Sequence, residues 1–275
     1  MNPHFKVLEA AYQLHFYFCL KTHFLKPHLA TPEAEKLVSK VLERVCQREQ
    51  YHLLQLDVSA TQLRLLLSLK PTHAVSQVVR LLKGNLERDF RNSFRMEKLL
   101  GRGYFVRSSG KASLEAARKY VENQVTHHGY KGDWTKPLKF RNPNFKSPAF
   151  TFEHCAALLT YHLVLVTQTR LPIFEEAIAP KLFAYLMAIG VKHRFSVERV
   201  GLLPDHMHML FEGIPSICVE EYVLAIMNNT RYWMEKNYFG VLKAMEAWDV
   251  WQQSYYVGTV GEFTTAQVRA FLQAK

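Results

Sequence analysis

The sequence lacks the features that mark membrane, secreted and zinc-ribbon proteins. No apolar run approaches the roughly 20 residues of a bilayer-spanning helix, and the N-terminus shows no charged, then apolar, then small-residue signal pattern. Cys19, Cys46, Cys155 and Cys218 have no CxxC spacing, which argues against a structural zinc site or a disulfide framework. We therefore expect a cytoplasmic protein with buried thiols in a reducing compartment.

Acidic residues are also in deficit. The chain has 24 Asp and Glu against 35 Lys and Arg, for a formal net charge of +11 over 275 residues. Such an excess favours a polyanionic partner. Aromatic residues are plentiful and no basic amphipathic helix stands out, so nucleic acid is the expected partner and not a membrane surface.

One motif carries two histidines. Residues 204–211 read Pro-Asp-His-Met-His-Met-Leu-Phe, and this alternation predicts a strand with His206 and His208 on one face and apolar side chains on the other. Two neighbouring imidazoles on a rigid sheet can hold one divalent metal ion. The spacing alone leaves a second interpretation open, because a chain with 13 histidines can also contain an exposed, uncommitted pair.

The chain repeats itself. Four blocks of the first half lie over four of the second: 12–21 over 161–170, 51–58 over 195–202, 59–71 over 203–215 and 103–110 over 254–261. Each copy reads strand, helix, strand, strand, helix, strand, helix, and a repeat of this length indicates a duplicated domain.

The repeat predicts the domain organisation. We expect a first domain at residues 1–128, a linker without its own core at 129–153 and a second domain at 154–275. In the first copy Thr31 should cap a helix that begins at Pro32. The corresponding helix should run from about 174 to 189, with Pro180 as a kink or break.

The two copies differ in their chemistry. Where the second copy has His206 and His208, the first has Gln62 and Arg64, which cannot form the same metal site. The final helix of the first copy carries Tyr120 and Gln124, four residues apart and hence on one face, whereas the second copy has Phe271 under Tyr120. A tyrosine hydroxyl beside a metal-bound phosphate is a sensible nucleophile that would form a phosphotyrosine ester.

Residues 119–124, 161–167, 203–210 and 255–261 resemble the single-tyrosine HUH transposases, the TnpA-like enzymes of insertion sequences and their REP-associated relatives. The resemblance covers nearly the whole chain twice. It implies an α+β fold of two tandem ferredoxin-like or RRM-like domains, with antiparallel sheets that carry helices on one face. It also implies that His206, His208 and Gln124 bind Mg²⁺ or Mn²⁺, that Tyr120 is the nucleophile and that no nucleotide cofactor is needed.

A family subunit holds all these residues itself, and many members are dimers in which the tyrosine helix of one subunit docks onto the histidines of the other. Here the residues are split between two fused copies, so we expect a single-chain pseudodimer with one composite active site. Its expected activity is metal-dependent cleavage and rejoining of single-stranded DNA next to a hairpin, through a 5′-phosphotyrosine intermediate. Full transposition joins two ends and would need two tyrosines, so one composite site per chain implies either a dimer of pseudodimers or a more limited reaction. The involvement of an accessory protein is left open. On DNA, the protein would be nucleoid-associated.

Several basic and aromatic residues are candidates for DNA contact: Arg64, Arg80, Lys83, Lys131, Trp134, Lys136, Lys139, Arg141 and Arg170. In the linker they alternate with Phe140 and Phe145, a pattern that suits phosphate contacts and base stacking. An equally good interpretation is a solvated tether whose aromatic residues cover the domain surface.

Three further alternatives remain at this stage. Tyr255 and Tyr256 are rival nucleophiles, although sheet packing is the better interpretation of their apolar strand. Asp205 could orient a metal-ligating histidine or serve only as a turn residue. The whole protein could be a catalytically inactive, domesticated hairpin-DNA-binding protein.

Overall fold

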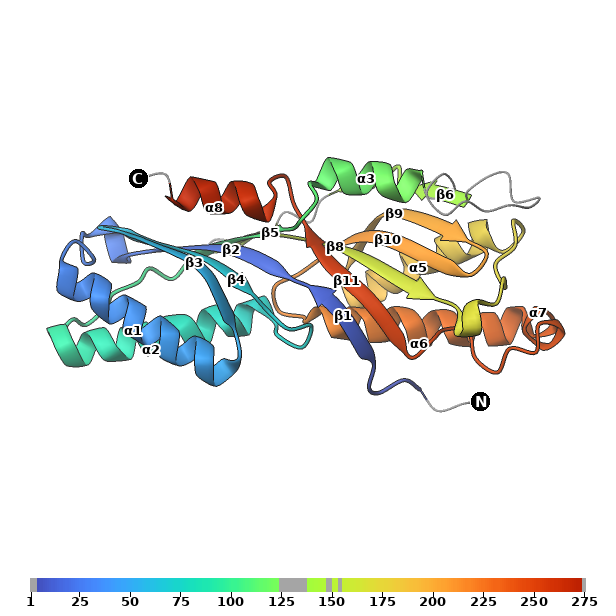
Figure 1. Ribbon diagram of the computed structural model, residues 1–275, viewed down its shortest axis with the longest axis horizontal. Coiled ribbons are helices and arrows are strands. Elements are labelled where there is room, and N and C mark those ends of the chain that lie inside the picture. The colour runs from blue at the N-terminus through green and yellow to red at the C-terminus, as the bar shows by residue number, and fades with distance from the viewer. Residues whose placement is uncertain (1–3, 124–137, 147–149, 153–154, 274–275) are drawn as a thin grey trace.

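The computed structural model describes residues 4–123, 138–146, 150–152 and 155–273 (Figure 1). It is an elongated α+β molecule in which the two halves lie end to end, and this confirms the predicted fold class. Among the described residues, no helix is both long enough and apolar enough to cross a membrane.

The first half contains five strands, three α-helices and a short 3-10 helix among the described residues. In chain order these are β1 (Glu9–Gln13), β2 (His15–Lys21), η1 (His23–Leu25), α1 (Pro32–Glu49), β3 (His52–Ser59), β4 (Gln62–Ser68), α2 (Val75–Phe94), β5 (Tyr104–Ser109) and α3 (Leu114–Glu122).

The second half repeats this order after two short strands. The elements are β6 (Leu138–Arg141), β7 (Phe150–Phe152), β8 (Cys155–Val166), η2 (Gln168–Arg170), α5 (Ala179–His193), β9 (Ser196–Leu203), β10 (His206–Gly213), α6 (Val219–Asn237), α7 (Phe239–Ala244), β11 (Ser254–Val260) and α8 (Thr265–Gln273). The long strand β8 therefore corresponds to β1 and β2 together.

The described strands form one continuous sheet of 11 strands. The first half has the order β3-β4-β2-β5, and the second has the same order, β9-β10-β8, with β11 on the other side of β8. Neighbours within each half are antiparallel. The halves are joined by two parallel pairings, β5 with β8 and β1 with β11.

Strand pairing corrects one predicted block of the repeat. Lys21 pairs with Gln62, and Val166 pairs with His206. Because Gln62 and His206 are equivalent, Lys21 corresponds to Val166, and the residue equivalent to Tyr161 is Phe16. The alignment of 12–21 with 161–170 was therefore wrong by four residues, since aromatic residues alternate along both β1 and β2.

The predicted helix starts fare differently in the two copies. The Thr31 hydroxyl accepts a hydrogen bond from the amide of Ala34 at 3.2 Å, and α1 begins at Pro32 as predicted. In the second copy Pro180 neither kinks nor breaks a helix: it lies in the first turn of α5, which begins at Ala179. A proline is tolerated there because the first amides of a helix have no intrahelical partner.

A pseudo-twofold seam joins the two halves. The Ser108 hydroxyl donates to the carbonyl of Val260 at 2.6 Å, and the equivalent Thr259 hydroxyl donates to the carbonyl of Ser109 at 2.5 Å. Next to them, the amide of Leu114 donates to Gly261 at 2.7 Å and that of Thr265 donates to Gly110 at 2.8 Å. The last strand of each copy thus leads its final helix across the seam.

Two equivalent glycines permit this crossing. A Cβ atom on Gly110 would lie 2.0 Å from the carbonyl oxygen of Thr259, and one on Gly261 would lie 2.2 Å from that of Ser108. Both contacts are with backbone atoms that cannot move aside. The crossing therefore requires glycine at both positions.

Helices cover the sheet in two layers (Figure 1). The pairs α1 and α2 in one half and α5 and α6 in the other pack on one face. The final helices lie on the other face and are exchanged between halves, because α3 packs on β9 and β10 and α8 packs on β3 and β4.

Part of the predicted linker is sheet. Residues 138–141 form β6, which pairs antiparallel with β9, and Phe140 stacks on Phe183 of α5 at 5.1 Å. For Phe140 this matches the interpretation in which linker aromatics cover the domain surface. The predicted boundaries at residues 128 and 154 stay predictions.

Candidate functional site

His206 and His208 lie side by side on β10, as the alternating pattern predicts. Met207 and Met209 point from the same strand into the apolar core, so the two histidines face the opposite side of the sheet. Each histidine is only 4% exposed. Their ring centroids are 5.1 Å apart, close enough for both imidazoles to serve one ligand.

Asp205 contacts the first of these histidines. Its Oδ1 is 2.6 Å from Nδ1 of His206, and its Oδ2 accepts a hydrogen bond from Nη1 of Arg170 at 3.2 Å. A carboxylate on Nδ1 orients the ring and directs Nε2 toward a ligand. The geometry matches the orienting interpretation of Asp205.

A third histidine, His162 of β8, completes the group. Its Nε2 is 3.0 Å from Nδ1 of His208, and the two rings stack with centroids 5.3 Å apart. Burial lowers the pKa of His162 to about 4, so this imidazole is neutral near pH 7. A neutral ring can share a single proton with His208 without placing a charge beside it.

Tyr120 reaches this group from the other half of the chain. Its ring centroid lies 5.5 Å from that of His208 and 5.8 Å from that of His162, in edge-on geometry. Helix α3 is positioned by a small apolar cluster of its own, formed by Leu114, Ala117, Val121, Leu210 and Val260.

Ion pairs tie the same helix to β9. Nε of Arg118 lies 2.5 Å from Oε1 of Glu198, and Arg199 pairs with Glu122 and, at 3.2 Å, with Glu198. Glu198 and Arg199 are nearly buried, at 4% and 9% exposure. Solvent and salt screen partly buried ion pairs less than exposed ones. The ion pairs of Arg118 and Arg199 therefore help to hold α3 over the histidines.

A cavity of about 970 Å³ opens beside these residues and is lined by Tyr120, His162, His208 and Tyr256, among others. Tyr255 is buried, as the packing interpretation of its strand requires. Tyr256 differs from that interpretation: it is 40% exposed in the cavity, with its ring centroid 6.3 Å from that of His162.

The donor set fits a divalent cation in part. His206 and His208 both use Nδ1 in the contacts described above, the arrangement in which Nε2 is the metal-ligating nitrogen. Within the described part of the chain, no three His, Cys, Asp or Glu side chains are grouped to hold a metal ion. The predicted third ligand, Gln124, lies outside the described residues, and the metal roles stay predictions.

The equivalent position in the first half has a different lining. Arg64 stands where the second half has His208, and its guanidinium pairs with Asp57 and lies 5.4 Å from the ring of Phe271. Gln62, at the position of His206, accepts a hydrogen bond from the Cys19 thiol at 3.5 Å. Here an arginine and a phenylalanine meet where the other half brings histidine and tyrosine together.

The predicted DNA contacts are scattered. Arg170 lies beside the site, where it donates a hydrogen bond to Asp205. Arg141 lines a charged pocket with Arg118 and Arg199. Lys139 is exposed on β6 and Arg80 is exposed on α2.

The ammonium group of Lys83 is bound within the protein. It donates to the carbonyls of Gly101, Arg102 and Gly103, and burial lowers its pKa. Lys131, Trp134 and Lys136 lie outside the described residues.

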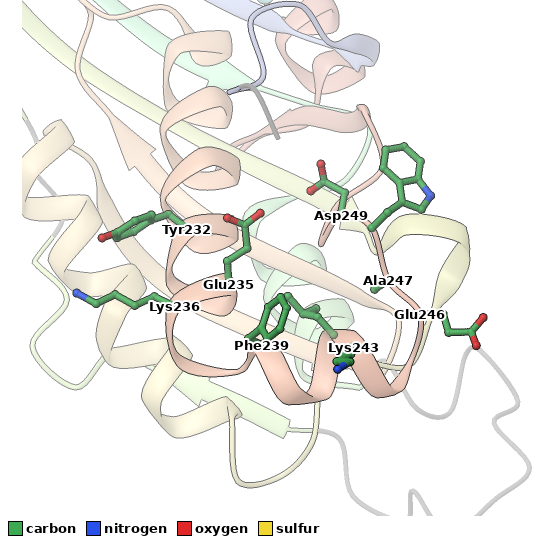
Figure 2. Close-up of a pocket in the computed structure, with 10 residues that line it drawn as sticks. Tyr232, Glu235, Lys236, Phe239, Lys243, Glu246, Ala247 and Asp249 are labelled. Carbon is green, nitrogen blue, oxygen red and sulfur yellow. The ribbon is translucent and has the colours of Figure 1, made fainter. Parts of the chain in front are cut away.

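A separate pocket of about 660 Å³ lies on α6 and α7 (Figure 2). Tyr232, Glu235 and Lys236 come from α6, and Phe239 and Lys243 from α7. None of the residues predicted for the site lines it.

Sequence reasoning missed His162 and the four ion-paired residues that hold α3. His162 lies in the motif of residues 161–167. Because side chains alternate along β8, it is on the same face as Val164, the partner of His208. That signal becomes readable only once the pairing of β8 with β10 is known.

Part of this chain is similar to several known transposases. The ISDra2 transposase TnpA of Deinococcus radiodurans is 25% identical over 117 residues, which cover 42% of this chain and 84% of that protein. A solved transposase structure from Deinococcus radiodurans covers 42% of this chain and 92% of its own, at 20% identity and a TM-score of 0.34. The structure of a REP-associated tyrosine transposase bound to a REP hairpin covers 47% and 76%, at 10% identity and a TM-score of 0.31.

The family model described as "Transposase IS200 like" matches residues 10–124 and again residues 155–275. Together the two segments span most of the chain, and the match supports a DNA transposase function. The chain belongs to the IS200-like transposase family and carries two tandem copies of its domain.

Proposed function

We propose that this protein is a metal-dependent single-stranded DNA transposase that cleaves and rejoins DNA beside a hairpin at one composite site. The observation that carries the proposal is the approach of Tyr120, on a helix from the first half, to His208 and His162 on the sheet of the second. The equivalent position in the first half has Arg64 and Phe271 in place of histidine and tyrosine, and supplies neither a second nucleophile nor a second histidine pair.

The chemistry is a transesterification. The Tyr120 oxygen attacks the phosphorus of the scissile phosphodiester and loses its proton to solvent, while the P–O3′ bond breaks and the leaving 3′-oxygen takes up a proton. The products are a 5′-phosphotyrosine ester and a free 3′-hydroxyl, and attack by another 3′-hydroxyl reverses the step. A Mg²⁺ or Mn²⁺ ion held by His206, His208 and Gln124 would polarise the phosphoryl oxygen.

The other residues bind and orient. Asp205 holds His206, His162 holds His208, and the ion pairs of Arg118 and Arg199 keep the tyrosine helix over the strand. Tyr256 in the cavity offers a ring on which a nucleotide next to the scissile phosphate can stack. Joining two ends would need two composite sites, and therefore two chains.

The test is adduct formation on single-stranded DNA that carries the element's end hairpin, in Mg²⁺ or Mn²⁺. Wild type should form a covalent protein–DNA adduct, and Tyr120→Phe and His206→Ala/His208→Ala should not. Tyr256→Phe is the matched control, because it removes a hydroxyl from the same cavity and should still form the adduct.

Two results would contradict the proposal. If wild type binds the hairpin without ever forming an adduct, the protein is a DNA-binding remnant. If the adduct persists in Tyr120→Phe and is lost in Tyr256→Phe, the nucleophile is the other tyrosine. Mixing Tyr120→Phe with the double-histidine variant restores adduct only if the site forms between chains.

A further inference from the structure

The first half keeps an open pocket where the second half has its candidate site. Its volume is about 550 Å³, and it lies between β5 and α8, the counterparts of β11 and α3. The residues that line it are Tyr17, Phe105, Arg107, Ser108, Ser109, Glu262, Phe263, Gln267, Val268 and Phe271. The first-half counterpart of the candidate site is therefore still open.

The lining residues correspond one by one with those of the candidate site. From the strand pairings, Tyr17 takes the place of His162 and Phe105 that of Tyr256. On the exchanged helix Phe271 takes the place of Tyr120, and at its start Phe263 takes that of Ala112. The pocket has one tyrosine and three phenylalanines where the cavity of the other half has one histidine, two tyrosines and one alanine.

Two of these rings are costly to leave in water. Phe263 is 57% exposed and Phe271 is 60% exposed. A single exposed phenylalanine needs no explanation. Rings that converge on one open pocket from β2, β5 and α8 form an apolar site for a ligand.

The charges around the pocket are balanced. Nη1 of Arg107 lies 2.5 Å from Oε2 of Glu262, and its guanidinium carbon is 5.3 Å from the ring centroid of Phe105. Arg64 pairs with Asp57 beneath Phe271. Among the described residues that line this pocket, Arg107 is the only arginine. Because a carboxylate meets its guanidinium, the lining suits an uncharged planar ring better than a phosphate, and the guanidinium plane of Arg107 can itself stack on that ring.

We propose that this pocket binds an unpaired nucleobase of the single-stranded DNA on which the composite site acts. The inference rests on the proposed function for its substrate. Both exchanged helices lie on the same face of the sheet (Figure 1), so one strand of DNA can engage the pocket in the first half and the composite site in the second. The net charge of +11 attracts the backbone of that strand, and the pocket takes the base.

The test compares binding of a fluorescein-labelled, mixed-sequence single-stranded 20-mer to wild type and to Phe263→Ala/Phe271→Ala. Loss of a base–aromatic stack should weaken binding by about 5- to 150-fold. Both rings are more than half exposed, so the double variant should keep the melting temperature of wild type. The matched control is Phe239→Ala, which removes a ring of similar exposure, 64%, from the pocket of Figure 2 and should bind DNA as wild type does.

Two further measurements separate stacking from other causes. Phe271→Trp, which keeps an aromatic face, should bind as tightly as wild type. A strand that carries 5-iododeoxyuridine should crosslink to the peptide that contains Phe263 or Phe271. Equal affinity of wild type and Phe263→Ala/Phe271→Ala, with crosslinks elsewhere, would overturn the proposal and leave the pocket to another occupant such as a protein segment.

These outcomes are distinct from failure of the proposed function. A wild type that never forms the Tyr120 adduct, yet binds single strands more tightly than Phe263→Ala/Phe271→Ala, refutes the transposase chemistry and supports the base pocket. If wild type forms the Tyr120 adduct and Phe263→Ala/Phe271→Ala binds single strands as tightly as wild type, the transposase chemistry is supported and the base pocket is refuted.

Discussion

The ring of Tyr120 lies 5.5 Å from the ring of His208, although the two residues belong to different halves of the chain. The exchange of the final helices produces this contact, and the exchange is symmetric in backbone while asymmetric in side chains. On one side of the seam it brings a tyrosine to three histidines, and on the other it brings Phe271 to Arg64. A fused chain can lose one of the two sites because its halves cannot dissociate as separate subunits can, so the tyrosine of one half always meets the histidines of the other.

Removing the ion pair between Arg118 and Glu198 should loosen the docking of α3 on β9. We expect that in Arg118→Met the backbone amides of α3 exchange hydrogen about 10- to 150-fold faster, because a partly buried charged hydrogen bond contributes about 1.5 to 3 kcal/mol. Adduct formation should slow in parallel. Hydrogen exchange followed by mass spectrometry measures the first effect.

Arg44→Met is the control for this variant. Arg44 pairs with Asp89 on the surface of the α1–α2 layer, and an exposed pair contributes little. Its loss should leave exchange in α3 unchanged. Unaltered exchange in Arg118→Met as well would mean that the Arg118–Glu198 pair does not hold the helix.

His162 is expected to act as a positioning residue for His208. In His162→Ala the affinity for Mn²⁺ should fall by about 10- to 100-fold, since loss of a group that orients a metal ligand has costs of this size. His162→Gln, which keeps a polar group near Nδ1 of His208, should recover part of that loss. Isothermal titration with Mn²⁺ measures both.

One control makes this result specific. His52→Ala removes an exposed histidine of β3 and should leave the affinity unchanged. If His162→Ala binds Mn²⁺ as tightly as wild type, the 3.0 Å contact with His208 has no part in metal binding.

Much of this architecture can be read from the sequence, and the reasons are local. Alternation in residues 206–211, the Thr31 cap and the blocks around Tyr120 each depend on neighbours in the chain. Two of the mistakes came from relationships between strands: the four-residue shift along β1 and β2, and the absence of His162 from the predicted site. Both depend on which residue of β8 pairs with His208, and no local pattern carries that information.

Alanine substitution should change the free energy of unfolding in opposite directions at two glycines, one at the seam and one within a helix. Gly261→Ala should lower the free energy of unfolding by about 3 kcal/mol, because its Cβ would overlap the Ser108 carbonyl and force the crossing strands apart. Gly84→Ala should raise it by about 0.5 to 1 kcal/mol, since Gly84 lies within α2 with no atom in the way of a Cβ. Urea denaturation of both variants measures the difference. Equal stability of Gly261→Ala and wild type would show that the seam can rearrange.

The choice of metal is the last prediction. Mn²⁺ should support half-maximal adduct formation at a concentration at least about tenfold lower than Mg²⁺, because imidazole nitrogen is a poor ligand for Mg²⁺, which prefers oxygen and keeps its waters. EDTA should abolish the reaction, and Mn²⁺ added in excess should restore it. The two-histidine set of His206 and His208 is the source of the preference, so hairpin binding, measured in EDTA by anisotropy, should not depend on either metal. Adduct formation in EDTA would mean that Tyr120 reacts without a metal ion. Half-saturation at a lower concentration of Mg²⁺ than of Mn²⁺ would mean that these histidines are not the metal ligands.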